Sequence, residues 1–107
     1  MPTYKNELTQ ILHEHRAVML YFSSPSCNVC HALKPKLVTA VKAAFPEMQL
    51  HTVDVTHDGE TAAAYNVFSI PTVLIFLEGK EYVRKSRYMS VDEIIQALTR
   101  PYALLTS

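Results

Sequence analysis

The two cysteines of the chain, Cys27 and Cys30, lie three positions apart in the segment SCNVCH, residues 26–31. They follow a short apolar stretch and precede an amphipathic one, so a strand should end and a helix should begin here. A helix N-terminus favours negative charge, and the thiolate is the reactive form of cysteine. Cysteines in such motifs can have one thiol pKa lowered from about 8.5 to roughly 3.5–7.5. The position of the pair therefore predicts a redox-active dithiol.

The same residues also match two other kinds of site. With His31, the cysteines form the C-x-x-C-H pattern of covalent haem attachment, but haem would need a second axial ligand, an apolar pocket and export. Zinc would use Cys27, Cys30 and His31, yet structural zinc sites have four ligands and adjacent residues diverge on a helix. The dithiol is therefore the favoured interpretation, and it requires neither a metal nor a cofactor.

Apolar periodicity and turn residues predict eight elements in the order αβαβαββα. The helix after the cysteines carries an apolar stripe at every fourth residue from Val29 to Phe45, and Pro35 inside it should cause a kink. A capping box over residues 90–93 opens the last helix, and Pro101 should end it before a weakly specified tail. This order predicts an α/β fold, a mixed sheet with helices on both faces. The expected helices span residues 3–15, 28–45, 60–65 and 90–101, and the expected strands span residues 17–23, 50–55, 72–77 and 81–86.

A second motif, Ile70-Pro71-Thr72, stands directly before the apolar strand over residues 73–76. Proline is tolerated at a strand entry, because its missing N–H is not needed there. The alternative is a cis-proline, which is usually a deliberate structural feature. A cis bond would turn the Ile70 backbone outward, so that an extended peptide could pair with it by strand addition.

With these motifs, the chain resembles the thioredoxin family over about residues 15–100. The resemblance rests on the strand–CxxC–helix unit, Pro35 five residues after the second cysteine, the Ile-Pro-Thr motif, and a Glu-Gly-Lys hairpin turn at residues 78–80. It implies a central sheet flanked by helices, with the dithiol beside the cis-proline. The strand that usually opens the family fold has no counterpart here, so we expect a sheet of four strands.

The resemblance also implies a function and a set of site residues. The function is thiol–disulfide exchange with protein disulfides, in the service of cellular redox balance, with a thioredoxin-reductase-like electron donor. Cys27 would be the exposed nucleophile, Cys30 the more buried resolving thiol, and Pro71 the cis-proline. The substrate groove would be lined by Ser26, Asn28, Val29, Ser69, Ile70 and Pro71.

Several residues depart from the family pattern. Ser26 stands where thioredoxins have tryptophan, Asn28-Val29 replaces Gly-Pro, and residues 87–89 replace a glycine loop, which makes the groove rim bulkier. Tyr21 occupies the place of the family's buried acid, and its reference pKa of about 10 makes it a poor base near neutrality. Tyr21, His31 and Pro35 are therefore candidate tuning residues, with His31 either an exposed helix residue or a cation that stabilises the thiolate. The rival function is a non-catalytic binding module or redox sensor.

Length and charge limit the partners. A chain of 107 residues has the size of one domain, which we expect residues 1–107 to form. Ten Lys and Arg balance ten Asp and Glu, which disfavours nucleic acid and acidic membranes as partners. No basic leader precedes an apolar stretch, and the longest apolar run, Ala17–Phe22, is too short for a bilayer. These features predict a cytoplasmic monomer.

Overall fold

The computed structural model describes residues 5–107 of the chain, and over this range it contains eight elements in the expected order. The bounds of seven elements agree with the prediction to within one residue wherever they are described; the expected start of the first helix at Thr3 lies outside the described residues. The elements are α1 (Lys5–Glu14), β1 (Ala17–Ser23), α2 (Asn28–Ala44), β2 (Gln49–Asp54), α3 (Gly59–Ala64), β3 (Thr72–Leu77), β4 (Lys80–Ser86) and α4 (Val91–Thr106).

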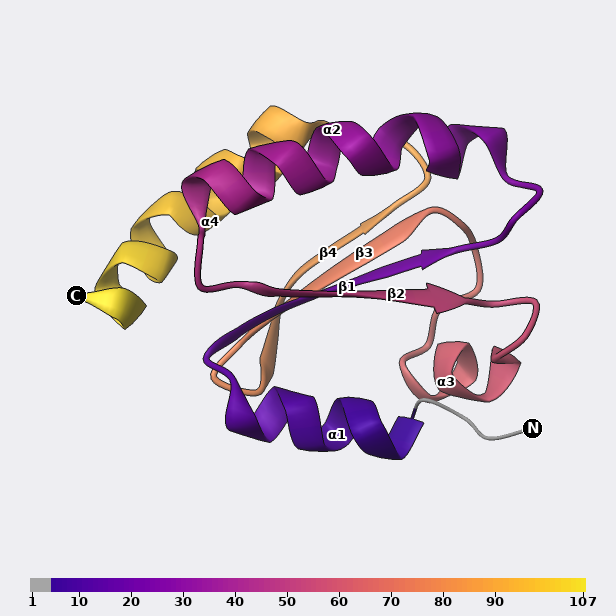
Figure 1. The fold of residues 1–107 in the computed structure, drawn as a ribbon, viewed down its shortest axis with the longest axis horizontal. Coiled ribbons are helices and arrows are strands. Elements are labelled where there is room, and N and C mark those ends of the chain that lie inside the picture. Colours follow the sequence, from indigo (N-terminus) through magenta and orange to yellow (C-terminus); the bar gives the residue numbers. More distant parts are fainter. Residues whose placement is uncertain (1–4) are drawn as a thin grey trace.

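Among the described residues, the strands form one four-stranded mixed sheet in the order β2-β1-β3-β4. Strands β1 and β2 are parallel, whereas β1 with β3 and β3 with β4 are antiparallel. Helices α2 and α4 cover one face of the sheet, and α1 and α3 cover the other (Figure 1). The predicted α/β architecture is confirmed.

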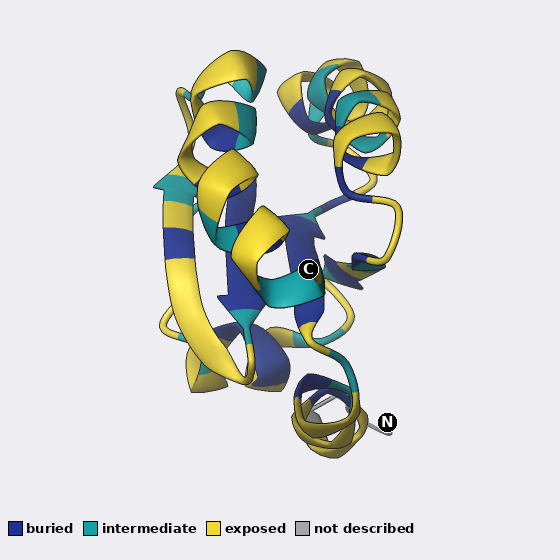
Figure 2. Cartoon of the chain, turned by 90° about the vertical axis from the view of Figure 1, so that its left-hand side faces the viewer, coloured by how far each residue is buried: buried dark blue, intermediate teal, exposed yellow. Residues whose placement is uncertain are grey.

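Each face of the sheet has its own apolar core, because successive side chains of β1 and β3 point to opposite faces. Both strands are buried over nearly their whole length, and the helices turn their exposed residues outward (Figure 2). On the side of α2 and α4, the core includes Met19, Tyr21, Leu37, Val41, Ile75 and Leu98. On the side of α1 and α3, it includes Leu8, Leu20, Phe22, Val53, Val67 and Leu74.

Strand pairing brings three connecting segments to one end of the sheet. Phe22 near the end of β1 pairs with Thr72 at the start of β3, and Thr72 pairs with Ser86 at the end of β4. The loop after β1, the segment before β3 and the loop after β4 therefore emerge together. These three segments carry the cysteines, the Ile-Pro-Thr motif and residues 87–89.

The prediction that Pro101 ends the last helix is wrong: α4 continues through Pro101 to Thr106. Tertiary contacts hold the final turns. Tyr102 is buried and packs on Phe45 with ring centroids 4.8 Å apart, and its hydroxyl accepts a hydrogen bond from the backbone N–H of Glu47 at 2.8 Å. Arg16 donates to the Leu105 carbonyl at 2.8 Å. These contacts offset the single helical hydrogen bond that the proline ring removes.

Two other local expectations have different outcomes. The cap of α4 is confirmed, since the Ser90 hydroxyl accepts the N–H of Glu93 at 3.2 Å. The apolar stripe of α2 is only partly buried: Leu37, Val41 and Phe45 lie in the core, but Val29 is 60% exposed. Val29 lies in the first turn of α2, next to the cysteine pair. No helix in residues 5–107 is both long and apolar enough to cross a membrane.

Candidate active site

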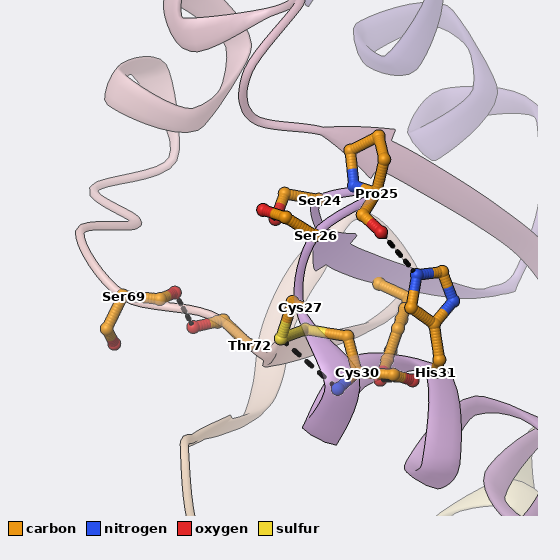
Figure 3. Close-up of a disulfide and its surroundings, with 9 residues drawn as sticks. Ser24, Pro25, Ser26, Cys27, Cys30, His31, Ser69 and Thr72 are labelled. Atoms are coloured by element: carbon orange, nitrogen blue, oxygen red, sulfur yellow. Dashed lines mark hydrogen bonds between the residues drawn. A yellow bond between two sulfur atoms is a disulfide. The ribbon is translucent and has the colours of Figure 1, made fainter.

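Cys27 and Cys30 form a disulfide at the start of α2, with their Cα atoms 5.3 Å apart (Figure 3). Cys27 is the N-cap residue of the helix, and Cys30 lies in its first turn. Cys27 is half-buried, whereas Cys30 is only 1% exposed. Cys27 is therefore the more accessible of the two cysteine residues.

The backbone around Cys27 suits a negatively charged sulfur. The N–H of Cys30 donates to Cys27 Sγ at 3.2 Å, so the thiol side chain caps its own helix. The first turn of α2 contains no acidic residue, and the helix dipole places partial positive charge at this end. When the disulfide is reduced, both effects stabilise the Cys27 thiolate relative to the thiol.

Alkylation of the reduced protein tests whether the Cys27 thiol is more reactive than the Cys30 thiol. We expect iodoacetamide to modify Cys27 before Cys30, because Cys27 is both more accessible and closer to the helix N-terminus. The rate at Cys27 should level off below the ordinary thiol pKa of about 8.5, since the thiolate forms at lower pH. Peptide mass spectrometry over a pH series measures both rates, and equal or faster labelling of Cys30 would reverse the two roles.

A short network fixes the loop that precedes the helix. The N–H of Cys27 donates to the Ser24 carbonyl at 3.2 Å, and the hydroxyls of Ser24 and Ser26 lie 3.4 Å apart. His31 is exposed, but its Nε2 donates to the Pro25 carbonyl at 2.8 Å. The imidazole thus connects the first turn of α2 to the loop (Figure 3), a contact that the sequence did not indicate.

Tyr21 reaches the resolving cysteine through its hydroxyl. The side chain is buried under α2, and its hydroxyl donates to the Cys30 carbonyl at 2.8 Å. Burial raises the pKa of Tyr21 above its ordinary value, because the phenolate would lose hydration. Tyr21 therefore keeps its proton near neutral pH and holds the backbone of Cys30, but it does not offer a base.

The proline motif lies at the same end of the sheet as the disulfide. The Ile70–Pro71 peptide bond is cis, and Pro71 is buried. The Thr72 hydroxyl donates to the Ser69 carbonyl at 2.7 Å, which closes the turn before β3 (Figure 3). Ile70 and Cys27 both pack against the core on the α2 side. Asn28 is exposed near them, and Pro35 is exposed more than one helical turn beyond Cys30.

Large apolar side chains are exposed around this end of the sheet. Val29, Phe68 and Tyr88 are 60%, 85% and 93% exposed; Val29 lies in the first turn of α2, Phe68 in the segment before β3 and Tyr88 in the loop after β4. Beside Phe68 lies an apolar hollow of about 320 Å³, which Ser69 and Ile70 also line. Sequence reasoning missed Phe68; the available signal was a large apolar residue in the turn between a helix and the proline motif.

No group of three or more His, Cys, Asp or Glu side chains converges into a metal site within residues 5–107. His31 is turned toward the Pro25 carbonyl. The cysteine sulfur atoms are bonded to each other in this state.

Comparisons with known proteins agree with this geometry. The thioredoxin family model matches residues 2–100. The thioredoxin-like protein YdfQ of Bacillus subtilis (strain 168) is 32% identical over 97 residues, which cover 91% of this chain and 86% of that protein. Thioredoxin of Chlamydia trachomatis is 31% identical, over 78% of this chain and 80% of its own. A stretch 37% identical to protein disulfide isomerase-like 1-4 of rice covers 69% of this chain but only 14% of that longer protein.

Solved structures give the same result. The X-ray structure of Fasciola hepatica thioredoxin superposes with a TM-score of 0.77 at 29% identity, over 94% of this chain and 98% of that one. Fold, family match and the paired cysteines at the helix start all agree. The chain therefore belongs to the thioredoxin family, and its cysteine pair makes it a thiol–disulfide oxidoreductase.

Proposed function

We propose that this protein exchanges its dithiol with disulfides of protein substrates, with Cys27 as the nucleophile and Cys30 as the resolving thiol. One observation carries the assignment: Cys27 caps α2 and accepts the N–H of Cys30, while Cys30 is 1% exposed. An incoming disulfide meets Cys27 first. Cys30 is placed to attack only the sulfur of Cys27.

The reaction takes two steps. The Cys27 thiolate attacks one sulfur of the substrate disulfide, forms a mixed disulfide and releases the other sulfur as a thiolate, which takes up a proton. Cys30 then loses its proton and attacks Cys27 Sγ, which releases the second substrate thiol. Two electrons pass to the substrate, and the protein is left with the Cys27–Cys30 disulfide that the structure contains.

We propose that the substrate binds as an extended segment along Ser69, Ile70 and Pro71. The exposed apolar residues at this end of the sheet support this, because a β-like peptide that pairs with the backbone would place side chains against Val29 and Phe68. Ser26 and Asn28 would contact the substrate around the target cysteine.

The balanced charge and the family of the protein support a proposal about its oligomeric state, location and partners. We propose a monomeric domain over residues 1–107, cytoplasmic, without nucleic-acid or membrane partners and without a bound cofactor. A thioredoxin-reductase-like protein would return electrons to the Cys27–Cys30 disulfide. Part of a rice disulfide-isomerase-like protein also matches this chain. Whether the protein reduces or oxidises its substrates depends on the reduction potential of the Cys27–Cys30 pair.

Turnover of a protein disulfide tests the proposal. We expect the protein to accelerate insulin reduction by dithiothreitol, measured as precipitation of the free B chain, and we expect Cys27→Ser to remove the acceleration. The Lys36→Ala variant is the control, because Lys36 is exposed on the same helix outside the proposed substrate contacts and its replacement leaves both thiols. A folded protein that binds insulin without accelerating its reduction would support the binding-module alternative, which the lack of a base at Tyr21 favours.

A further inference from the structure

Arg87 has a left-handed backbone conformation at the rim of the site. Its φ is 65°, a region that glycine enters readily and that a residue with a Cβ enters only at an energetic cost. Such strain in a native structure calls for a compensating interaction or a function, and it concentrates at ligand sites. Arg87 is thus a position where glycine would serve the backbone better than arginine.

The backbone of Arg87 is fixed close to the proline motif. Its N–H donates to the Pro71 carbonyl at 2.7 Å. The preceding residue, Ser86, pairs with Thr72, and their hydroxyls lie 3.0 Å apart. These contacts use no side-chain atom of Arg87, so the fold needs the conformation at this position but not the guanidinium.

The guanidinium of Arg87 is exposed and has no hydrogen bond or ion pair within the described part of the chain. Two other arginines, Arg84 and Arg16, make hydrogen bonds within the fold. Arg84 donates to both carboxylate oxygens of Glu81 and to the carbonyls of Tyr65 and Asn66, and Arg16 donates to the Leu105 carbonyl. Arg87 therefore keeps its full donor capacity for a molecule that approaches the site.

The surrounding segments leave this charge uncompensated. Residues 24–31, 66–72 and 86–91 contain no Asp or Glu, and Arg87 is their only Lys or Arg. The nearest acids in sequence, Asp92 and Glu93, belong to the first turn of α4, where the Glu93 N–H bonds Ser90. An acidic group that enters the rim would meet the guanidinium without competition from these three segments.

We propose that Arg87 is a specificity-determining residue that binds a carboxylate of the substrate close to the disulfide attacked by Cys27. This inference rests on the proposed function and adds a substrate class to it, namely disulfides flanked by acidic groups. A guanidinium can bind a carboxylate with two parallel hydrogen bonds, which gives orientation as well as attraction. Selection for acidic substrates would explain why a strained arginine occupies this position.

A charge series of small disulfides separates this role from the basic chemistry. The probes are oxidised glutathione, which carries carboxylates, hydroxyethyl disulfide, which is neutral, and cystamine, which is cationic. Stopped-flow kinetics would give the second-order rate constant for each with the reduced parent protein and with Arg87→Gly, Arg87→Gln and Arg87→Lys. The rate on hydroxyethyl disulfide serves as the internal reference for each variant.

We expect Arg87→Gly and Arg87→Gln to lower the ratio of the rate constant for oxidised glutathione to that for hydroxyethyl disulfide by about three- to tenfold. This range corresponds to the loss of one charged hydrogen bond that is exposed or partly desolvated. In the same variants, the ratio of the rate constant for cystamine to that for hydroxyethyl disulfide should rise. Arg87→Lys should keep part of the preference for oxidised glutathione. Added salt should reduce this preference in the parent protein. Chemical denaturation should show a higher unfolding midpoint for Arg87→Gly than for Arg87→Gln, because only glycine relieves the backbone strain.

Different results would overturn the role of Arg87 and the proposed disulfide exchange. Rate ratios that are the same in the parent, Arg87→Gly and Arg87→Gln would overturn the role of Arg87 and leave the exchange chemistry intact. A parent protein that reduces none of the three disulfides, the neutral one included, would overturn the proposed function and with it the inference about Arg87.

Discussion

Replacing Cys27 by serine is expected to abolish disulfide exchange, whereas replacing Cys30 by serine is expected to stop the reaction after its first step. Cys27 is the half-buried and more accessible cysteine at the helix start, so without it we expect no mixed disulfide to form. Cys30 is buried, and its loss leaves the attack by Cys27 intact but removes the group that releases the substrate. Intact-protein mass spectrometry at the end of an incubation with a disulfide-bonded peptide would show a lasting adduct only with Cys30→Ser.

A matched pair of controls makes this result specific. Lys36→Ala keeps both thiols and all proposed substrate contacts, and it should give the fully oxidised protein with no lasting adduct. The double variant Cys27→Ser, Cys30→Ser should give no adduct at all, which excludes attachment elsewhere. An adduct on Cys27→Ser and none on Cys30→Ser would show that the buried thiol attacks first, against the accessibility of the two sulfur atoms.

Much of the fold was predictable because its signals are local. The apolar run Ala17–Phe22 predicts β1, and the turn at Gly79 predicts the hairpin of β3 and β4, both with little help from tertiary contacts. The family resemblance predicted that the cysteine pair, which follows β1, lies beside the Ile-Pro-Thr motif, which precedes β3. What brings them together is strand pairing, such as that of Phe22 with Thr72.

The error at Pro101 has the opposite origin. Proline is a local signal for a helix end, and here long-range contacts outweigh it: Tyr102 packs on Phe45, and Arg16 binds the Leu105 carbonyl. Both partners are more than fifty residues away in the chain. Local sequence reasoning has no access to such contacts.

Parts of the candidate site were also beyond the sequence. The bulky residues 87–89 were recognised, but the left-handed φ of Arg87 and its free guanidinium depend on the pairing of β4 with β3. The bond from the Tyr21 hydroxyl to the Cys30 carbonyl likewise depends on how α2 crosses the sheet. The sequence identified the residues, whereas their partners required the structure.

The second large effect concerns the resolving step. Cys30 must lose a proton before it can attack, and Tyr21, with its pKa raised by burial, cannot accept that proton near neutrality. We therefore expect the mixed disulfide of the parent protein to accumulate transiently during turnover, and we expect Tyr21→Asp to speed its resolution by at least about tenfold. General-base assistance is typically worth about 10²–10⁴-fold, so a partial gain should be visible.

The surroundings of position 21 favour a functional carboxylate there. Tyr21 lines a hollow of about 380 Å³ between α2 and β2, together with Lys34, Lys42 and Thr52. Burial would raise the pKa of an aspartate at this position, and the two ammonium groups would lower it, so the carboxylate could gain and lose protons in the working range. The hollow would also give the proton a route to water.

Tyr21→Phe is the matched control for the Tyr21→Asp prediction. It removes only the hydroxyl and its bond to the Cys30 carbonyl, which should lower the free energy of unfolding by about 1 kcal/mol. Because the tyrosine is not a base, the resolution rate of Tyr21→Phe should stay near that of the parent. Quenched-flow sampling of the mixed disulfide gives the rates, and denaturation curves show whether each variant is folded. If a folded Tyr21→Asp resolves no faster than Tyr21→Phe, position 21 supports the packing of α2 and takes no part in proton transfer.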